Sequence, residues 1–277
     1  GSDTYANGKI SNEKMDDLCH TLKEFAQIME AYKVIAYKAY GTSAIRETEN
    51  TLILQDQIEQ RTGIRVEILS NSEQRFLDYK SIASKGETFR RIIEEKTAIL
   101  DIGGGSIQIS LFDKDTLVST QNLRLGVLRL QELLNHLNAG STQMEQLVDE
   151  LATAQLDDYK KLYLKDREIK NIIIVDDYLS PWAVRKAHER GDGNAMVDSK
   201  AFYQLMEALR TRGTTELAKR MDIAEEKVPL VYISAVLTKR IAELMGAALI
   251  WAPGVTLCDG IAYELSLIHI SEPTRPI

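Results

Sequence analysis

Four side chains in this sequence are of the types that phosphate chemistry requires, and each lies at the end of a predicted strand or shortly after one. They are Arg46, Glu73, Asp101 and Ser106, the last preceded by three glycines. A guanidinium binds a phosphate with two hydrogen bonds, a carboxylate accepts a proton from water, and glycine lets backbone N–H groups approach a phosphate closely. Together they predict a site that binds a phosphate chain and activates a water beside it.

The glycine segment is the most specific of these signals. Gly103, Gly104 and Gly105 are predicted to direct N–H groups at an anion, Ser106 adds a hydroxyl, and Asp101 is placed to hold a metal ion or orient a water. An alternating apolar pattern follows the glycines, so the next element is a strand; a dinucleotide fingerprint would need a helix there. No lysine follows the glycines, which excludes a P-loop. The alternative is a plain glycine-rich hairpin turn.

The other two candidates have structural alternatives that the sequence leaves open. Arg46 lies between a predicted strand and a helix, where α/β sheets bind ligands, but it is equally suited to a surface ion pair with Glu47 or Glu49. Glu73 is placed as a general base, but Ser70 and Glu73 also have the spacing of a helix capping box.

The elements around these residues alternate between strands and helices, which predicts an α/β fold with a parallel sheet. A helix with a core-facing stripe at residues 15–32 comes first, and the charged stretch of residues 85–96 is predicted to be a connection between two lobes. The predicted strands are residues 34–40, 64–69, 97–102, 107–112, 117–123, 172–176 and 249–257. The other predicted helices are residues 51–60, 70–84, 127–137, 142–162, 199–209, 214–220, 231–244 and a last one from 259.

Composition bounds the class of protein. The 277 residues are 44% hydrophobic and 27% charged, as in a water-soluble globular protein, and the net charge of −7 argues against a nucleic-acid partner. No apolar run approaches the ~18 residues of a membrane span. Only Cys19 and Cys258 are present, far apart, which favours a reducing, cytoplasmic location.

The three phosphate-type segments occur in an order that resembles the exopolyphosphatase / guanosine pentaphosphate phosphohydrolase (Ppx/GppA) family. The resemblance covers residues 10–264. It implies an actin-like fold of two lobes with a phosphate site in the cleft between them. The matching positions are residues 42–47, 68–73 and 101–106, Leu125-Gly126 and Asp259-Gly260.

The resemblance also implies a role for each residue. Arg46 binds substrate phosphate, Glu73 is the catalytic base, Asp101 serves a metal or water, and residues 103–106 hold phosphate. Mg²⁺ is the implied metal, inorganic polyphosphate or guanosine pentaphosphate the implied substrate, and a homodimer is left open.

Three positions depart from the family pattern. Gln74 stands where a second acid is common, and Gln108 stands where Glu is common, keeping an acceptor but losing its charge. Asp176 and Asp177 follow the strand that should lead into a small Gly-Thr phosphate turn. Two carboxylates there repel an anion unless a metal intervenes.

Both ends of the chain carry expectations. The family begins with a strand–Asp-x-Gly-Ser hairpin, and this chain starts after it, so the first lobe is predicted to be incomplete and the chain by itself inactive. Residues 265–277 resemble a translated sequencing adaptor and are set aside as a tail. The predicted division is therefore a partial first lobe at 1–96, a second lobe at 97–264 and the tail.

Three hypotheses follow for function. The first is hydrolysis of terminal phosphoanhydride bonds of polyphosphate, and the second is the same chemistry on guanosine pentaphosphate. The third is a phosphate-binding relative without catalysis, which Gln74 and Gln108 permit. A kinase of the same fold is less favoured because no second phosphate-donor motif is visible.

Overall fold

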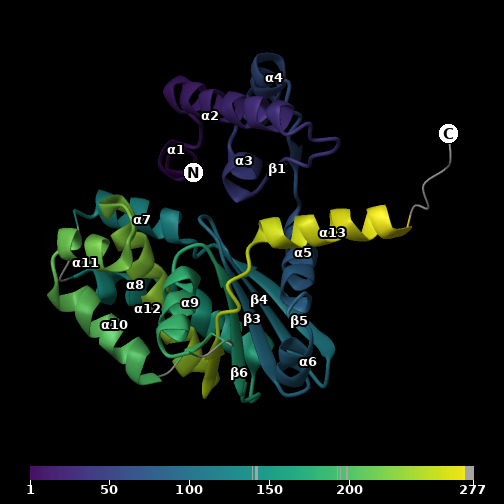
Figure 1. The fold of residues 1–277 in the computed structure, drawn as a ribbon. Helices are drawn as coiled ribbons and strands as arrows, with labels where there is room; N and C mark the ends of the chain where they lie inside the picture. The colour runs from purple at the N-terminus through teal and green to yellow at the C-terminus, as the bar shows by residue number, and fades with distance from the viewer. Residues whose placement is uncertain (139, 141–142, 192, 194, 198, 272–277) are drawn as a thin grey trace. The chain divides into compact units, whose positions relative to one another are not determined.

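Packing divides the chain into two units. The structure, a computed structural model, describes residues 1–138, 140, 143–191, 193, 195–197 and 199–271 (Figure 1). Unit 1 is Gly1–Gln74 and unit 2 is Arg75–Ile277. Residues 75–96, which the sequence predicts to close the first lobe, pack with unit 2.

Unit 1 is mainly helical, with one short parallel strand pair. Its core consists of Met15, Cys19, Leu54, Ile58, Ile64 and Val66. The predicted helix of residues 51–60 is confirmed and ends at Gly63, whose φ of 72° suits glycine. The elements are α1 (Ser2–Asn7), α2 (Asn12–Ala31), β1 (Tyr40–Gly41), α3 (Ser43–Glu47), α4 (Thr51–Thr62) and β2 (Glu67–Ile68), with α5 (Asn71–Ala83) crossing into unit 2.

Two predictions about unit 1 are wrong. Residues 34–39 do not form a strand; only Tyr40 and Gly41 pair, with Glu67 and Ile68. An apolar run becomes a strand only where a neighbour supplies hydrogen bonds; β2 pairs with two residues, and Ile35 is 93% exposed. In α2, the predicted stripe is buried at its beginning, but Phe25 is 55% exposed.

Unit 2 contains a six-stranded mixed sheet with the order β5-β4-β3-β6-β8-β7. β3 pairs antiparallel with β4 and parallel with β6. The predicted strands at 97–102, 107–112, 117–123 and 172–176 are confirmed, while the last predicted strand contracts to three residues. The strands are β3 (Thr97–Ile102), β4 (Ile107–Asp113), β5 (Thr116–Leu123), β6 (Asn171–Asp176), β7 (Met196–Val197) and β8 (Leu249–Trp251).

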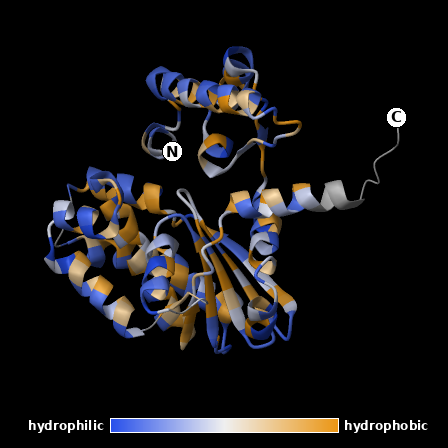
Figure 2. Cartoon of the chain, viewed as in Figure 1, coloured by the Kyte–Doolittle hydropathy of each residue, from blue (hydrophilic) through white to orange (hydrophobic). Residues whose placement is uncertain are grey.

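Helices cover both faces of this sheet, so its central strands are apolar on both sides (Figure 2). Leu100 and Ile174 face a large core shared with α7, α8 and α12, whereas Ile99 and Ile173 face a smaller core that includes Ile82 of α5. The helices of unit 2 are α6 (Glu87–Ile93), α7 (Val127–His136), α8 (Met144–Tyr159), α9 (Ser180–Glu189), α10 (Ser199–Thr211), α11 (Thr214–Met221), α12 (Val228–Met245) and α13 (Leu257–Ser271).

The charged stretch predicted as a connection contains helix α6. Its charges occupy the exposed side, and Ile92 and Ile93 at its end are buried against the sheet. The high charge of residues 85–96 therefore reflects the solvent-exposed side of this helix. The adaptor-like segment begins inside α13, and residues 272–277 lie outside the described residues.

Candidate phosphate site

The glycine segment forms a four-residue hairpin loop between β3 and β4. The strands pair up to Ile102 and Ile107, and the N–H of Gly103 donates to the carbonyl of Ser106 at 2.9 Å. The predicted strand–glycine–strand arrangement is confirmed. The loop therefore lies at the carboxyl end of β3, beside the carboxyl end of the parallel strand β6, where α/β sheets bind ligands.

The carbonyl oxygens of this loop cap helix α7. The N–H of Val127 donates to Gly103 O at 3.0 Å, and the N–H of Leu128 donates to Gly104 O at 2.9 Å. The Arg129 side chain donates to Gly105 O at 2.9 Å. These N–H groups of the first turn of α7 are thus occupied by the protein's own backbone.

The N–H groups of the loop consequently point the other way. In a trans peptide the C=O and the following N–H point in opposite directions, so carbonyls aimed at α7 direct the N–H groups of Gly104, Gly105 and Ser106 away from it. Within the described part of the chain, no backbone hydrogen bond uses these three groups. Gly104 and Ser106 are half-buried, and Gly105 between them is buried. Successive backbone N–H groups that face the same way are suited to bind an anion.

Gly126 allows the loop and α7 to approach this closely. A Cβ built on Gly126 would lie 2.2 Å from the carbonyl carbon of Gly105 and 2.3 Å from Gly104 O, distances that no side chain tolerates. Gly260 has the same role at α13, where a Cβ would lie 2.0 Å from the carbonyl oxygen of Leu77. Both glycines of the motif are thus explained by backbone contact.

A second carboxyl lies beside Asp101. Asp101 pairs in register with Gln108, and Gln108 Nε2 donates to Asp101 Oδ2 at 3.1 Å. Asp78 of α5, only 2% exposed, hydrogen-bonds to Asp101. Burial, and then the neighbouring Asp101 charge, raise the pKa of Asp78 to about 10.

Sequence reasoning missed Asp78. The signal was its spacing: Asp78 lies four residues before Ile82 and one after Leu77, both buried, and so falls on the core-facing stripe of α5. A charged residue in such a position is rarely buried unless it has a partner.

Asp176 is used inside the protein. Its carboxylate accepts from the N–H groups of Leu179 and Ser180 at 2.8 and 2.7 Å and from the Ser234 hydroxyl at 2.8 Å. It therefore caps the beginning of α9. A phosphate could bind at this helix end only by displacing the Asp176 carboxylate. The acid that stands here in place of the family's Gly-Thr turn therefore occupies the position where an anion would bind.

Arg46 stabilises the local fold of unit 1. Its guanidinium donates to the carbonyl of Leu69 and to Asn71 Oδ1, both at 2.5 Å, and so links α3 to the beginning of α5. Of the two acids proposed as surface partners, Glu49 pairs with Lys9 at 3.3 Å. Arg46 is half-buried, and substrate binding by it remains a prediction.

Glu73 forms the capping box that its spacing allowed. Its Oε2 accepts the N–H of Ser70 at 2.8 Å, and its own N–H donates to Ser70 Oγ at 3.2 Å. The bond from the Ser70 N–H, and then the Ser70 hydroxyl, lower the pKa of Glu73. A lowered pKa makes a weaker base, and the catalytic role of Glu73 remains a prediction.

The structure gathers part of the predicted site. Asp101, Ser106 and the three glycines lie together in unit 2, whereas Arg46 and Glu73 lie in unit 1. Convergence of the two sets remains a prediction. Among the described residues, no three His, Cys, Asp or Glu side chains are grouped to hold a metal ion.

The family model of the Ppx/GppA phosphatase family matches residues 1–269. This chain belongs to the Ppx/GppA phosphatase family. The hairpin at residues 103–106, its capping of α7 and the glycine at position 126 are thus features of a family member, and the predicted resemblance is confirmed.

Curated relatives match over shorter stretches. Exopolyphosphatase 1 of Mycobacterium leprae is 32% identical over 108 residues, which are 39% of this chain and 30% of the relative. A bifunctional 3-dehydroquinate synthase/phosphatase of Fusobacterium nucleatum is 23% identical over 171 residues, 58% of this chain and 25% of that protein. The chain thus spans less than a third of these relatives' lengths.

Solved structures of the family share the fold. An exopolyphosphatase from Cytophaga hutchinsonii superposes with a TM-score of 0.74 at 20% identity, covering 94% of this chain and 84% of that one. The Ppx/GppA family member of Aquifex aeolicus gives 0.73 at 14% identity, covering 98% and 87%. The predicted α/β fold of this Ppx/GppA protein is confirmed.

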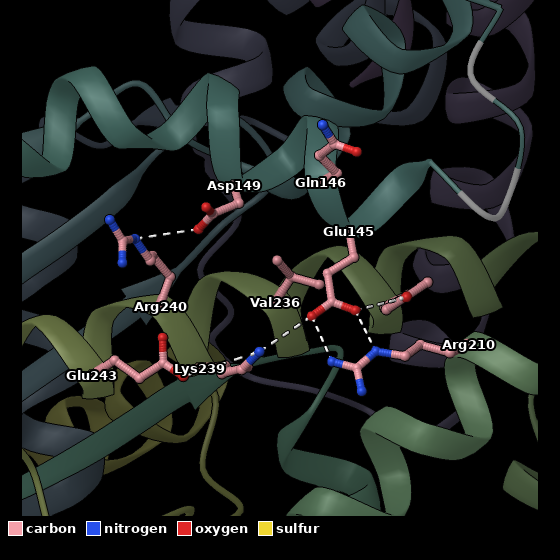
Figure 3. A pocket seen from close by; sticks show the side chains of 9 residues that line it. Glu145, Gln146, Asp149, Arg210, Val236, Lys239, Arg240 and Glu243 are labelled. Carbon is pink, nitrogen blue, oxygen red and sulfur yellow. Dashed lines mark hydrogen bonds and ion pairs between the residues drawn. The ribbon is translucent and has the colours of Figure 1, made fainter.

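A separate cavity of about 540 Å³ in unit 2 of this Ppx/GppA protein is lined from α8, α10 and α12 (Figure 3). Its cations are matched by acids. Arg210 makes two hydrogen bonds to Glu145 at 2.5 and 2.7 Å, Lys239 reaches Glu145 at 3.2 Å, and Arg240 pairs with Asp149 at 3.2 Å. We therefore interpret the cavity as a salt-bridge network joining three helices, despite its size.

No described helix is both long and apolar enough to cross a membrane.

Proposed function

We propose that the protein hydrolyses the terminal phosphoanhydride bond of inorganic polyphosphate and releases orthophosphate. The observation that carries the proposal is the hairpin of unit 2, with the free N–H groups of Gly104, Gly105 and Ser106 close to Asp101. Relatives named exopolyphosphatase, in sequence and in structure, support the same substrate.

The proposed reaction is a single displacement. The oxygen of a water attacks the terminal phosphorus, the bond to the bridging oxygen breaks, and that oxygen leaves with the shortened chain. Glu73 accepts the proton of the water, and Arg46 binds the phosphates that follow. The N–H groups of the loop stabilise the charge on the terminal phosphoryl oxygens.

A divalent cation fits this site by its donor atoms. Asp101 is surrounded by oxygen-bearing side chains, and buried oxygens of Asp78 and Gln108 lack a hydrogen-bond partner in the described part of the chain. Hard cations such as Mg²⁺ prefer such oxygens. Mg²⁺ would supply positive charge to the phosphoryl oxygens, which a protein of net charge −7 needs for a polyanionic substrate.

One observation favours a second candidate, a phosphate-binding relative without catalysis. The carboxylate of Glu73 is engaged by Ser70, which lowers its pKa and its strength as a base. In that case the hairpin would still bind a terminal phosphate, but no orthophosphate would be released.

The test is a phosphate-release assay with long-chain polyphosphate and guanosine pentaphosphate, each with Mg²⁺ and with a chelator. It uses the 277-residue chain. The proposed function predicts release of orthophosphate from polyphosphate in the presence of Mg²⁺ and much less with the chelator. If the protein hydrolyses guanosine pentaphosphate faster than polyphosphate, the nucleotide is the substrate. If it binds both but releases orthophosphate from neither, it is the non-catalytic phosphate-binding relative.

Variants connect this activity to the hairpin. Asp101→Asn is expected to lower kcat by about 100-fold or more, since it alters the group beside the attacked phosphate. Asp113→Asn at the opposite end of β4 serves as the control and is expected to have no effect.

We also propose a cytoplasmic location, supported by the free thiols of Cys19 and Cys258.

A further inference from the structure

Three successive peptide groups of the glycine loop are each held by a hydrogen bond to the carbonyl oxygen. Gly103 O and Gly104 O accept from backbone N–H groups in the first turn of α7, at 2.9–3.1 Å. Because the C=O and the following N–H of a trans peptide point in opposite directions, each of these bonds also sets the direction of one N–H group. The backbone of α7 thus orients the N–H groups of Gly104 and Gly105.

The third peptide group, between Gly105 and Ser106, is held by a side chain instead. No backbone hydrogen bond in the described part of the chain ends on Gly105 O, and this oxygen accepts from Nε of Arg129 at 2.9 Å. The backbone N–H of Arg129 donates to Gly104 O at 3.1 Å, so the side chain extends from a point already fixed to the loop. The direction of the Ser106 N–H therefore depends on Arg129.

Glycine at position 105 makes this side chain necessary. Without a Cβ, the residue lets the peptide group that follows it rotate at little steric cost. If this peptide turned over, its carbonyl oxygen would face the anion site in place of the Ser106 N–H, and the partial negative charge of the oxygen would repel a phosphate. A donor that holds Gly105 O against α7 prevents the rotation.

The donor at this position also carries a positive charge. Arg129 is half-buried, the protein has a net charge of −7, and Asp101 lies on β3 just before the loop. A guanidinium bonded to Gly105 O polarises the peptide group and strengthens the Ser106 N–H as a donor, since linked hydrogen bonds reinforce one another. The same charge attracts a polyanion to an acidic region of the protein.

We propose that Arg129 is a positioning residue for the phosphate: it orients and polarises the peptide group between Gly105 and Ser106 so that the third N–H group of the loop binds the terminal phosphoryl group. Arg129 acts through the loop. The inference rests on the proposed function in one respect, namely that the loop binds phosphate. It goes further by assigning part of that affinity to a residue outside the loop.

The experiment measures calorimetrically, with Mg²⁺ present, how the full chain binds methylenediphosphonate, a diphosphate analogue whose P–C–P bridge is not hydrolysed. Arg129→Ala is expected to weaken binding at least about tenfold, because a hydrogen bond from a charged group is lost. Arg129→Gln keeps a donor without the charge, so it is expected to recover part of the affinity, with a weaker dependence on salt.

Arg167→Ala is the matched control. Arg167 also donates to a backbone carbonyl, that of Tyr163, at 3.0 Å. It precedes the amino end of β6, at the edge of the sheet opposite the loop. The variant removes the same charge from the protein and is expected to bind the analogue as the wild type does.

A second measurement separates positioning from stability. In protein labelled with ¹⁵N-serine, the amide signal of Ser106 is identified by its absence from Ser106→Ala. Addition of the analogue is expected to shift this signal in the wild type and in Arg167→Ala, but not in Arg129→Ala. A purely structural role of Arg129 would leave the shift in the folded variant unchanged.

Three results would overturn the inference: a wild type that does not bind the analogue, an Arg129→Ala variant with wild-type affinity, or a Ser106 signal that shifts equally in both. If Arg129→Ala fails to fold, Arg129→Gln decides, and wild-type affinity of that variant at both low and high salt overturns the inference.

Failure of the proposed function is a separate outcome. If the variants have the expected effects but the wild type releases no orthophosphate from polyphosphate, the hydrolase is refuted and the role of Arg129 is retained. If the wild type releases orthophosphate and Arg129→Ala binds the analogue equally well, the role of Arg129 alone is refuted.

Discussion

Gly126→Ala tests whether the glycine hairpin is held by its contact with α7. The added Cβ would lie 2.2–2.3 Å from three backbone atoms of Gly104 and Gly105, where distances under 3.0 Å are essentially never found. Backbone atoms cannot turn aside as side chains do, so the loop and the helix must separate. This separation also loosens the bonds from Val127 and Leu128 to the loop carbonyls.

The magnitude follows from these contacts. Overpacking costs about 1–3 kcal/mol, and two loosened hydrogen bonds add about 1 kcal/mol each. We expect the free energy of unfolding of unit 2 to fall by about 3–5 kcal/mol. For a unit of this size that is a decrease in Tm of roughly 8–15 °C.

Gly213→Ala is a matched control. Gly213 and Gly126 are both helix N-caps with nearly identical backbone angles, −69° and 150° against −72° and 151°. A Cβ on Gly213 meets nothing within 4 Å. The local cost of alanine at an N-cap is below about 1 kcal/mol and is the same at both positions, so the difference between the variants isolates the steric contact.

The assay is urea unfolding followed by circular dichroism, together with binding of a short polyphosphate by calorimetry. Gly126→Ala is expected to lose polyphosphate binding along with stability, because the loop N–H groups move with the loop. If the two variants unfold within about 1 kcal/mol of each other, within the error of such measurements, the close contact between loop and helix is refuted.

Three further outcomes are expected. Glu73→Gln should lower the turnover number about 100-fold if Glu73 is the base; loss of only ~1 kcal/mol of stability would identify it as a helix cap. The bonds from Arg210 lower the pKa of Glu145 to about 2. The resulting stabilisation is therefore present above the pKa of an unfolded glutamate and disappears as the pH falls toward 2, so Glu145→Gln should lose stability at pH 7 and little at pH 2. The side chain of Glu145 is 23% exposed, so we expect ~1–2 kcal/mol from chemical unfolding at the two pH values. Deleting residues 265–277 should leave Tm unchanged or raise it, and a clear decrease would contradict the adaptor interpretation.

The sequence alone was sufficient to predict the glycine hairpin, the strands on either side of it and the helix cap at Ser70. The alternation after Gly105 predicts a strand rather than a helix, because side chains of a strand alternate between two faces and the pattern is local. The capping box of Ser70 and Glu73 is equally local, since both partners lie within one helical turn. Such features depend only on residues that are close together in the chain, so they can be predicted from the sequence.

Only the tertiary structure decided the partners of residues far apart in the sequence. Residues 34–39 have the composition of a strand, but a strand exists only where another chain segment supplies hydrogen bonds. The spacing of Asp78 places it on the core-facing side of α5, but only the packing of α5 on the sheet brings it to Asp101. Asp176 became a helix cap because α9 begins where its carboxylate lies. Burial and pairing are properties of three-dimensional neighbours, which no local pattern records.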